Sequence, residues 1–252
     1  MHATSVDELA AAATAAGVDK IVQVTASAMG YDNRYSIEGA QSRPDKILGV
    51  FGRFDPLAPD IQGRLERYFP QPEVLGIRFT LFHSWAQWWL EQRALDSFLR
   101  EVAKLNIPLA IFAPFQNTLL LETVRRHPEV RFLVDHMGIR VEPAQTLTSA
   151  FRQWDALLEL AKEPNVWIKV SYFPEAVMGS EAYPFRVAQQ HFERLVRHAG
   201  TTRLIWASNY PPVARSCTYA QTLQFVQEEC TFLSNAERTM ILGGNFQRDF
   251  LR

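Results

Sequence analysis

Two apolar stretches of this 252-residue chain end in side chains that can do chemistry. Residues 131–138 read RFLVDHMG and contain His136 near their end. Residues 203–212 read RLIWASNYPP and contain Asn209 near their end. An apolar run that ends in polar residues is typical of a buried parallel strand whose carboxyl end faces an active site. A neutral imidazole offers one donor and one acceptor, so His136 suits binding of a substrate carbonyl, acid–base catalysis or metal ligation. Asn209 can orient water or a carbonyl, but its amide has no basic lone pair with which to take a proton.

Further polar side chains stand at the ends of the other apolar runs. Among them, Arg53, Arg78 and Lys169 suit an anionic substrate, because arginine grips a carboxylate at two points. The alternative is that these cations only form ion pairs at the strand ends, with Asp55 or Glu175. For His136 the alternative is a core histidine bonded to backbone, with Asp135 capping the next turn. We predict that His136 and Asn209 are catalytic and that the substrate-binding set comprises Gln23, Thr25, Arg53, Arg78, Lys169, Tyr172 and Ser208.

The elements that position these residues follow from alternating apolar runs and helical patterns. The predicted strands are 20–25, 47–54, 74–81, 107–113, 131–136, 166–170 and 203–208. The predicted helices between and after them are 33–42, 60–69, 93–105, 116–127, 147–162, 184–198 and 218–229. A capping box of Ser5 and Glu8 opens a helix ahead of the first strand. This order predicts βαβ units in a single domain over 1–252, an α/β fold one strand short of a closed eight-stranded barrel.

Composition restricts the partners of this domain. A formal net charge of −1 and a pI near 6.6 give no reason to expect nucleic acid or an anionic membrane as a partner, while local arginines suit a small anionic molecule. Cys217 and Cys230 are too few for a disulfide framework. The first residues lack the pattern of a signal peptide, and no run approaches the ~20 apolar residues of a membrane span. We therefore expect a cytoplasmic protein.

The order and spacing of the apolar runs resemble those of the amidohydrolase-related family of TIM-barrel hydrolases, and in particular its lactonase-like branch. The matching segments are GVDKIVQV, LGVFGRFDP, LGIRFTLF, FLVDHMG, VWIKVSYF, LIWASNYPP and ILGGNFQRDF. The resemblance implies a (β/α)8 barrel that hydrolyses a lactone or a similar small cyclic or carboxylated substrate. The family often binds a divalent metal such as zinc.

The resemblance also exposes departures. Family members open with a strand that carries a His-x-His pair, whereas this chain begins after that point and His2 stands alone. Asn209 occupies the position of an aspartate that takes a proton from water, and no histidine ends the 107–113 strand, where metal-dependent relatives supply a ligand. One histidine without the aspartate does not make the three protein ligands of a catalytic zinc, so we expect no metal in this chain.

Three hypotheses follow. In the first, the chain is a hydrolase in which His136 polarises or protonates the substrate while Asn209 and Ser208 position the attacking water. In the second, it is a catalytically impaired or non-catalytic small-molecule binding protein that keeps the barrel. In the third, it is a truncated product without independent activity. Loss of a first strand would expose the edges of the 20–25 and 203–208 strands, which predicts a homo-oligomer formed across the gap, or poor solubility.

Overall fold

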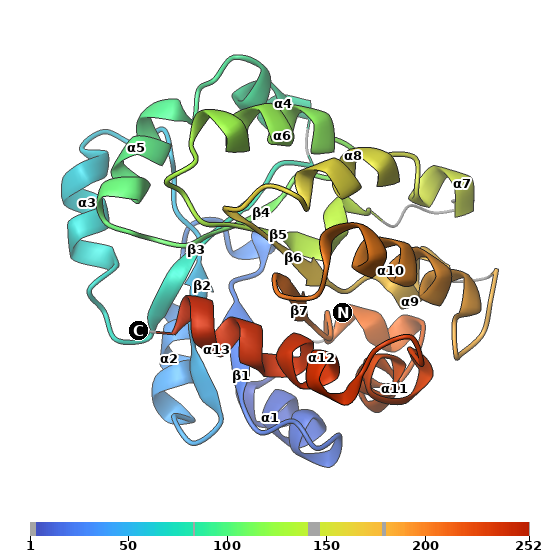
Figure 1. Cartoon of the computed structure of the whole chain (residues 1–252). Coiled ribbons are helices and arrows are strands. Elements are labelled where there is room, and N and C mark those ends of the chain that lie inside the picture. Colours follow the sequence, from blue (N-terminus) through green and yellow to red (C-terminus); the bar gives the residue numbers. More distant parts are fainter. Residues whose placement is uncertain (1–3, 83, 141–146, 178–179, 252) are drawn as a thin grey trace.

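Seven parallel strands form one curled sheet in the computed structural model, which describes residues 4–82, 84–140, 147–177 and 180–251 (Figure 1). The strands pair in chain order, each with the next. They are β1 (Ile21–Val24), β2 (Ile47–Gly52), β3 (Val74–Thr80), β4 (Leu109–Phe112), β5 (Phe132–Val134), β6 (Val166–Val170) and β7 (Leu204–Trp206). Each lies within a strand predicted from the sequence, so the α/β fold class is confirmed.

Helices surround the outside of the sheet (Figure 1). The α-helices are α1 (Val6–Ala15), α2 (Arg34–Ser42), α3 (Ile61–Tyr68), α4 (Ser84–Glu91), α5 (Asp96–Lys104), α6 (Asn117–Arg126), α7 (Leu147–Ala150), α8 (Trp154–Leu160), α9 (Phe173–Ala176), α10 (Arg186–Ala199), α11 (Tyr219–Gln224), α12 (Asn235–Thr239) and α13 (Asn245–Phe250). Short tight or wide helical turns are η1 (Ser27–Met29), η2 (Asp135–Gly138), η3 (Pro212–Arg215), η4 (Phe225–Glu229) and η5 (Met240–Gly244). The Ser5–Glu8 capping box opens α1 as predicted.

The prediction of one helix over 147–162 was wrong, because α7 and α8 are separate. Gln153 leaves the helical region between them, with φ −113° and ψ 26°. Its side-chain oxygen accepts a hydrogen bond of 2.8 Å from the backbone N–H of Asn117, the first residue of α6. That N–H has no partner within α6, since the first N–H groups of a helix lack intrahelical acceptors. The break therefore satisfies a donor on the neighbouring helix.

Side chains of each strand alternate between two apolar layers. Residues such as Phe51, Ala110 and Leu133 meet on the concave side of the sheet. Their neighbours, including Ile111 and Val134, pack against the helices in the larger outer cluster. Because side chains of successive strand residues point to opposite faces, this parity decides which polar residues can face the interior.

The sheet does not close into a barrel among the described strands. β1 pairs only with β2, and β7 pairs only with β6. The backbone N–H groups of Ile21 and Thr25 bond to oxygens of Lys46 and Phe51 at 2.9 and 3.0 Å, on the β2 side. The alternate N–H groups of β1, at Val22 and Val24, therefore face the open edge. This arrangement confirms a barrel of the predicted type that lacks one strand.

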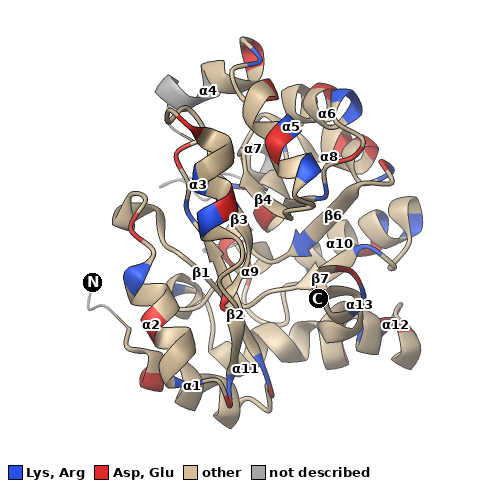
Figure 2. Ribbon diagram, turned by 90° about the vertical axis from the view of Figure 1, so that its left-hand side faces the viewer, with Lys and Arg blue, Asp and Glu red and all other residues tan. Residues whose placement is uncertain are grey.

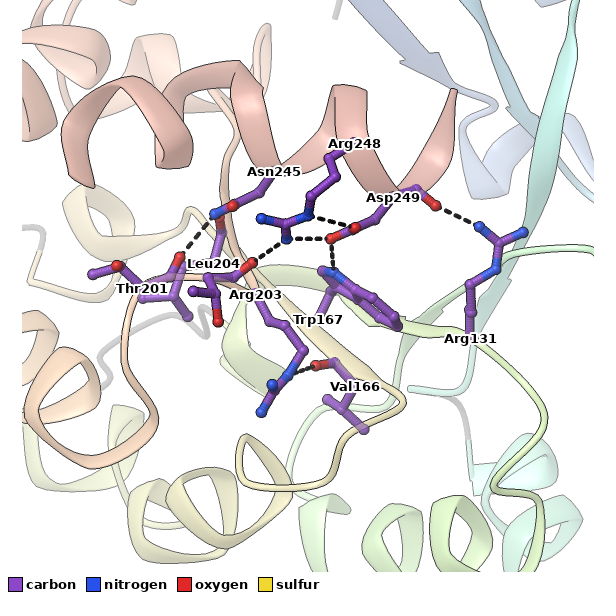
Figure 3. A network of polar contacts seen from close by, with 10 residues as sticks. Arg131, Val166, Trp167, Thr201, Arg203, Leu204, Asn245, Arg248 and Asp249 are labelled. Atoms are coloured by element: carbon purple, nitrogen blue, oxygen red, sulfur yellow. Dashed lines mark hydrogen bonds and ion pairs between the residues drawn. The ribbon is translucent and has the colours of Figure 1, made fainter. Parts of the chain in front are cut away.

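The C-terminal helix α13 covers the end of the sheet at which the strands begin (Figure 3). Trp167, near the start of β6, donates from its indole N–H to an Asp249 carboxylate oxygen at 2.7 Å. The Asn245 amide donates to the backbone oxygens of Thr201 and Leu204 at 2.7 and 2.8 Å. Helix α13 thus covers the end at which the strands begin, and the carboxyl ends of the strands form the opposite end of the sheet.

The surface shows no single-sign face in the view of Figure 2, where basic and acidic segments are interspersed over the outer helices. Among the described helices, none combines the length and the apolarity needed to cross a lipid bilayer.

Candidate active site

Three strand ends share an unusual backbone conformation. His136 after β5, Tyr172 after β6 and Asn209 after β7 have φ angles of 54°, 66° and 52°. Positive φ is uncommon outside glycine and is costly for bulky residues such as His and Tyr. Such strain persists only where the surrounding structure imposes it, and it concentrates at functional sites. In this chain the positive φ occurs at all three of these residues, which follow the carboxyl ends of neighbouring strands.

His136 is held by three neighbours. Its Nδ1 lies 2.6 Å from the Ser171 hydroxyl, its ring stacks on Tyr172 at 4.2 Å between centroids, and Phe112 meets it edge-on at 5.2 Å. Burial lowers the pKa of His136 to about 3, assisted by the charges of Lys169 and Arg78 and opposed by Asp135. The imidazole is therefore neutral at pH 7, so it suits hydrogen bonding to a carbonyl better than donating a proton as a cation.

Asp135 lies at the centre of a buried charge cluster. Its side chain is 1% exposed, and it forms ion pairs with Arg78, at 3.1 Å from Nε, and with Lys169. Burial opposes its charge, but the two cations hold the pKa of Asp135 well below its usual range. Arg78 and Lys169 are thus paired, as the alternative interpretation held, although with Asp135 and not with Asp55 or Glu175. Two cations against one anion leave an excess positive charge beside His136.

Asn209 contacts a second, differently placed carboxylate. Its Nδ2 donates to Glu175 Oε1 at 2.7 Å, and its side chain also hydrogen-bonds Tyr172. Glu175 is 7% exposed. Burial raises the pKa of Glu175 to about 7, an effect that the Asn209 hydrogen bond partly offsets. The site therefore contains one carboxylate that stays charged, Asp135, and one that titrates near neutral pH, Glu175.

Arg53 extends the positive region toward β1 and β2. Its Nη1 donates to the Thr80 hydroxyl at 3.1 Å, and its Nε donates to the Gly30 backbone oxygen at 2.6 Å. An open cavity of about 350 Å³ lies beside it. Three arginines are among its lining residues, which include Tyr31, Asn33, Arg53, Asp55, Arg64, Arg67 and Tyr68. This chemistry suits an anionic group.

The structure brings together six of the predicted site residues. His136 stacks on Tyr172, which hydrogen-bonds Asn209. Arg78 and Lys169 pair with Asp135, the residue before His136, and Arg53 lies near enough to Arg78 for the Arg78 charge to lower its pKa. The other three have different hydrogen-bond partners or neighbours. Thr25 bonds to Ser36 of α2 at 3.0 Å, and Gln23 lies against Gly39 of α2. The Ser208 hydroxyl accepts from the Tyr210 N–H at 3.2 Å, although Ser208 lines a small pocket with Ser171 and Tyr172.

Strand parity explains where Gln23 lies. Val22 and Val24 pack on the concave side, so Gln23 between them faces α2. Its position at a strand end did not reveal this, because the side chain one residue earlier or later points the opposite way.

Sequence reasoning missed Asp135, Ser171 and Glu175 as members of the site. Ser171 could have been predicted from the sequence, because it stands two residues after Lys169 and so faces the same side of the sheet. Asp135 had been interpreted only as a turn cap. Glu175 sits in the short helix α9, where no periodic pattern predicts which neighbour its side chain meets.

The site does not supply a protein cage for a metal ion within the described residues. No group of three or more His, Cys, Asp and Glu side chains in that part of the chain could hold one. Asp135 already forms ion pairs with Arg78 and Lys169, and Glu175 already accepts a hydrogen bond from the Asn209 amide. Catalytic zinc sites use three protein ligands, so the described donor set does not fit one.

A parallel α/β sheet with polar residues gathered at the carboxyl ends of its strands is the arrangement of the TIM-barrel class of folds. Residues 1–248 match the family model described as amidohydrolase, and the chain belongs to that family. It is 28% identical over 236 residues to an L-fucono-1,5-lactonase of Burkholderia ambifaria, covering 91% of this chain and 79% of that protein.

Solved structures show the same fold. An amidohydrolase from Burkholderia multivorans, with bound zinc, superposes with a TM-score of 0.82 at 21% identity, covering 97% of this chain and 87% of that one. A probable 2-pyrone-4,6-dicarboxylic acid hydrolase from Acinetobacter baumannii, with citric acid bound, gives a TM-score of 0.75 at 22% identity, covering 98% and 88%.

Proposed function

We propose that this chain hydrolyses a small lactone that carries a negative charge. Water attacks the ring carbonyl, the acyl C–O bond breaks, the ring oxygen takes one proton of the water, and the second proton leaves to solvent. The observation that carries the proposal is the buried cationic excess of Arg78 and Lys169 over Asp135, next to a neutral His136. The similarity to a lactonase and to a probable pyrone dicarboxylic acid hydrolase supports this substrate class.

Each residue has a role set by its contacts. When the Ser171 hydroxyl donates to Nδ1 of His136, the proton of the neutral imidazole resides on Nε2, which can donate to the substrate carbonyl oxygen. Asn209 orients the attacking water. Arg53, which is only partly buried, binds the substrate carboxylate, while Arg78 and Lys169 raise the local potential. We propose that no resident metal takes part.

A matched substrate pair tests the charge preference. We expect kcat/KM for a carboxylated lactone to exceed that for its methyl ester by about 10-fold, the value of one charge-assisted hydrogen bond. Arg53→Gln should remove most of this preference, whereas Arg194→Gln, an exposed control paired with Asp155, should retain it. A chelator should leave the rate unchanged. Equal rates for the two substrates would contradict the proposal.

A non-catalytic binding protein is the second candidate, favoured by the lack of a basic lone pair on Asn209. It predicts saturable binding of the carboxylated lactone, measured by calorimetry, without turnover. Activity that appears only in Asn209→Asp would support the binding protein, and wild-type turnover would exclude it.

We also propose that the open edges of β1 and β7 associate with a second copy of the chain. Unpaired strand edges invite pairing, so sedimentation should show concentration-dependent dimers or larger species. Val24→Pro removes an N–H that faces the open edge and leaves the β1–β2 hydrogen bonds intact, so it should weaken the association. A wild-type monomer at every concentration of a dilution series would contradict this proposal.

A further inference from the structure

Glu175 is a buried carboxylate that the proposed reaction leaves without a role. Its Oε1 accepts the Asn209 amide, whereas its Oε2 is buried with no hydrogen-bond partner among the described residues. An unpaired buried acceptor costs free energy, so a structure retains one mainly where it has a use. Glu175 is hydrogen-bonded to Asn209, the residue assigned to the attacking water.

The charge of Glu175 constrains which way the Asn209 amide faces, alongside the hydrogen bond between the Asn209 side chain and Tyr172. A carboxylate can only accept hydrogen bonds, so Nδ2 and not Oδ1 of Asn209 must point toward it. Oδ1 is then turned away from Glu175 and can accept a hydrogen bond from water. A protonated Glu175 can instead donate to Oδ1, which allows the amide to rotate and present its N–H groups.

We propose that Glu175 is a positioning residue that acts through Asn209: the carboxylate form holds Oδ1 available to the attacking water, and the neutral acid releases it. This inference rests on the proposed lactone hydrolysis for the identity of the water. In this proposal Asn209 orients the attacking water and Glu175 supplies the ionisable group. A single aspartate would combine both functions.

The surroundings of Glu175 suit such a switch. The titratable groups that interact with it are Tyr172 on the preceding segment and Cys217 after η3. Burial raises the pKa of both, that of Cys217 to about 12, so both are neutral at pH 7. No charged group in the described parts of η3 or α10, which pack on α9, influences the pKa of Glu175. Its pKa of about 7 thus reflects burial, which raises it, and hydrogen bonds from the Asn209 amide and from the backbone of Glu175 itself, which lower it.

Nuclear magnetic resonance can test the switch without any substrate. The side-chain NH₂ signals of Asn209, assigned by their absence in Asn209→Ser, should shift with pH about a midpoint near 7. The shift should vanish in Glu175→Gln and persist in Glu66→Gln, a matched change at an exposed carboxylate. Signals that do not move with pH, or that still titrate in Glu175→Gln, would overturn the proposal.

Activity supplies the second readout. Wild-type kcat/KM should rise between about pH 6 and 8, with Glu66→Gln following the same profile. Glu175→Gln should lose this rise and fall by about 10-fold to 100-fold at pH 8, the effect of a misplaced water. A wild-type rise that survives in Glu175→Gln would overturn the assignment. If neither protein hydrolyses lactones while the Asn209 signals titrate as expected, the proposed function fails and the Glu175–Asn209 coupling stands.

Discussion

Replacement of His136 by alanine is expected to lower kcat/KM for lactone hydrolysis by about 10²-fold to 10⁴-fold, the range found when a polarising or acid–base group is removed. The reason is that Nε2 is the donor assigned to the carbonyl oxygen, and Ser171 and Tyr172 hold the ring in one orientation. Because the pKa of His136 is lowered to about 3, the imidazole remains neutral from pH 5 upward. Its titration should therefore not appear in the pH profile of activity near neutrality.

A matched control separates this effect from general damage. His198→Ala removes a partly exposed histidine at the end of α10 and should leave kcat/KM unchanged. The near-ultraviolet circular dichroism of His136→Ala should match that of wild type, which excludes unfolding as the cause. Activity of His136→Ala within a few-fold of wild type would show that the carbonyl is polarised elsewhere.

Replacement of Asp135 by asparagine is expected to lower the free energy of unfolding at pH 7 by about 3–5 kcal/mol. The change leaves Arg78 and Lys169 buried without their anion, and uncompensated buried charge is costly. Asp155→Asn, at an exposed ion pair with Arg194, should change the free energy of unfolding by less than about 1 kcal/mol. Urea unfolding monitored by circular dichroism measures both.

The pH dependence of this difference is a second check. The pKa of Asp135 is lowered in the folded state, so its stabilisation is complete above the unfolded pKa of about 3.9. It is lost as the pH falls below that value toward the folded pKa. The gap between wild type and Asp135→Asn should therefore be widest at neutral pH and shrink below about pH 4. A gap that is constant with pH would mean that Asp135 is not ionised in the folded protein.

The strands were predictable because each is an apolar run bounded by turn residues. β3, for example, is buried along its whole length from Val74 to Thr80. Their parallel order followed from the helical segments between them. The break between α7 and α8 was not predictable, because it depends on the Gln153 side chain, which accepts a hydrogen bond from the backbone N–H of Asn117 in α6. Such a contact is tertiary and leaves no periodic signal.

The site was predictable to the extent that strand ends meet at one edge of the sheet. His136, Asn209 and Tyr172 meet for that reason. The pairing of Arg78 and Lys169 with Asp135 could not be foreseen, because it joins residues far apart in sequence from three strand ends. Glu175 was hidden for a related reason, since its partner Asn209 lies 34 residues away.

The most direct test of the central claim is the initial rate of opening of a carboxylated lactone in ¹⁸O-labelled water, followed by mass spectrometry. We predict that the wild-type chain exceeds the spontaneous rate and places one ¹⁸O atom in the new carboxylate. With His136→Ala the rate should return close to the spontaneous value. A wild-type rate equal to that without protein, in a sample shown to be folded, would contradict the assignment of this chain as a lactone hydrolase.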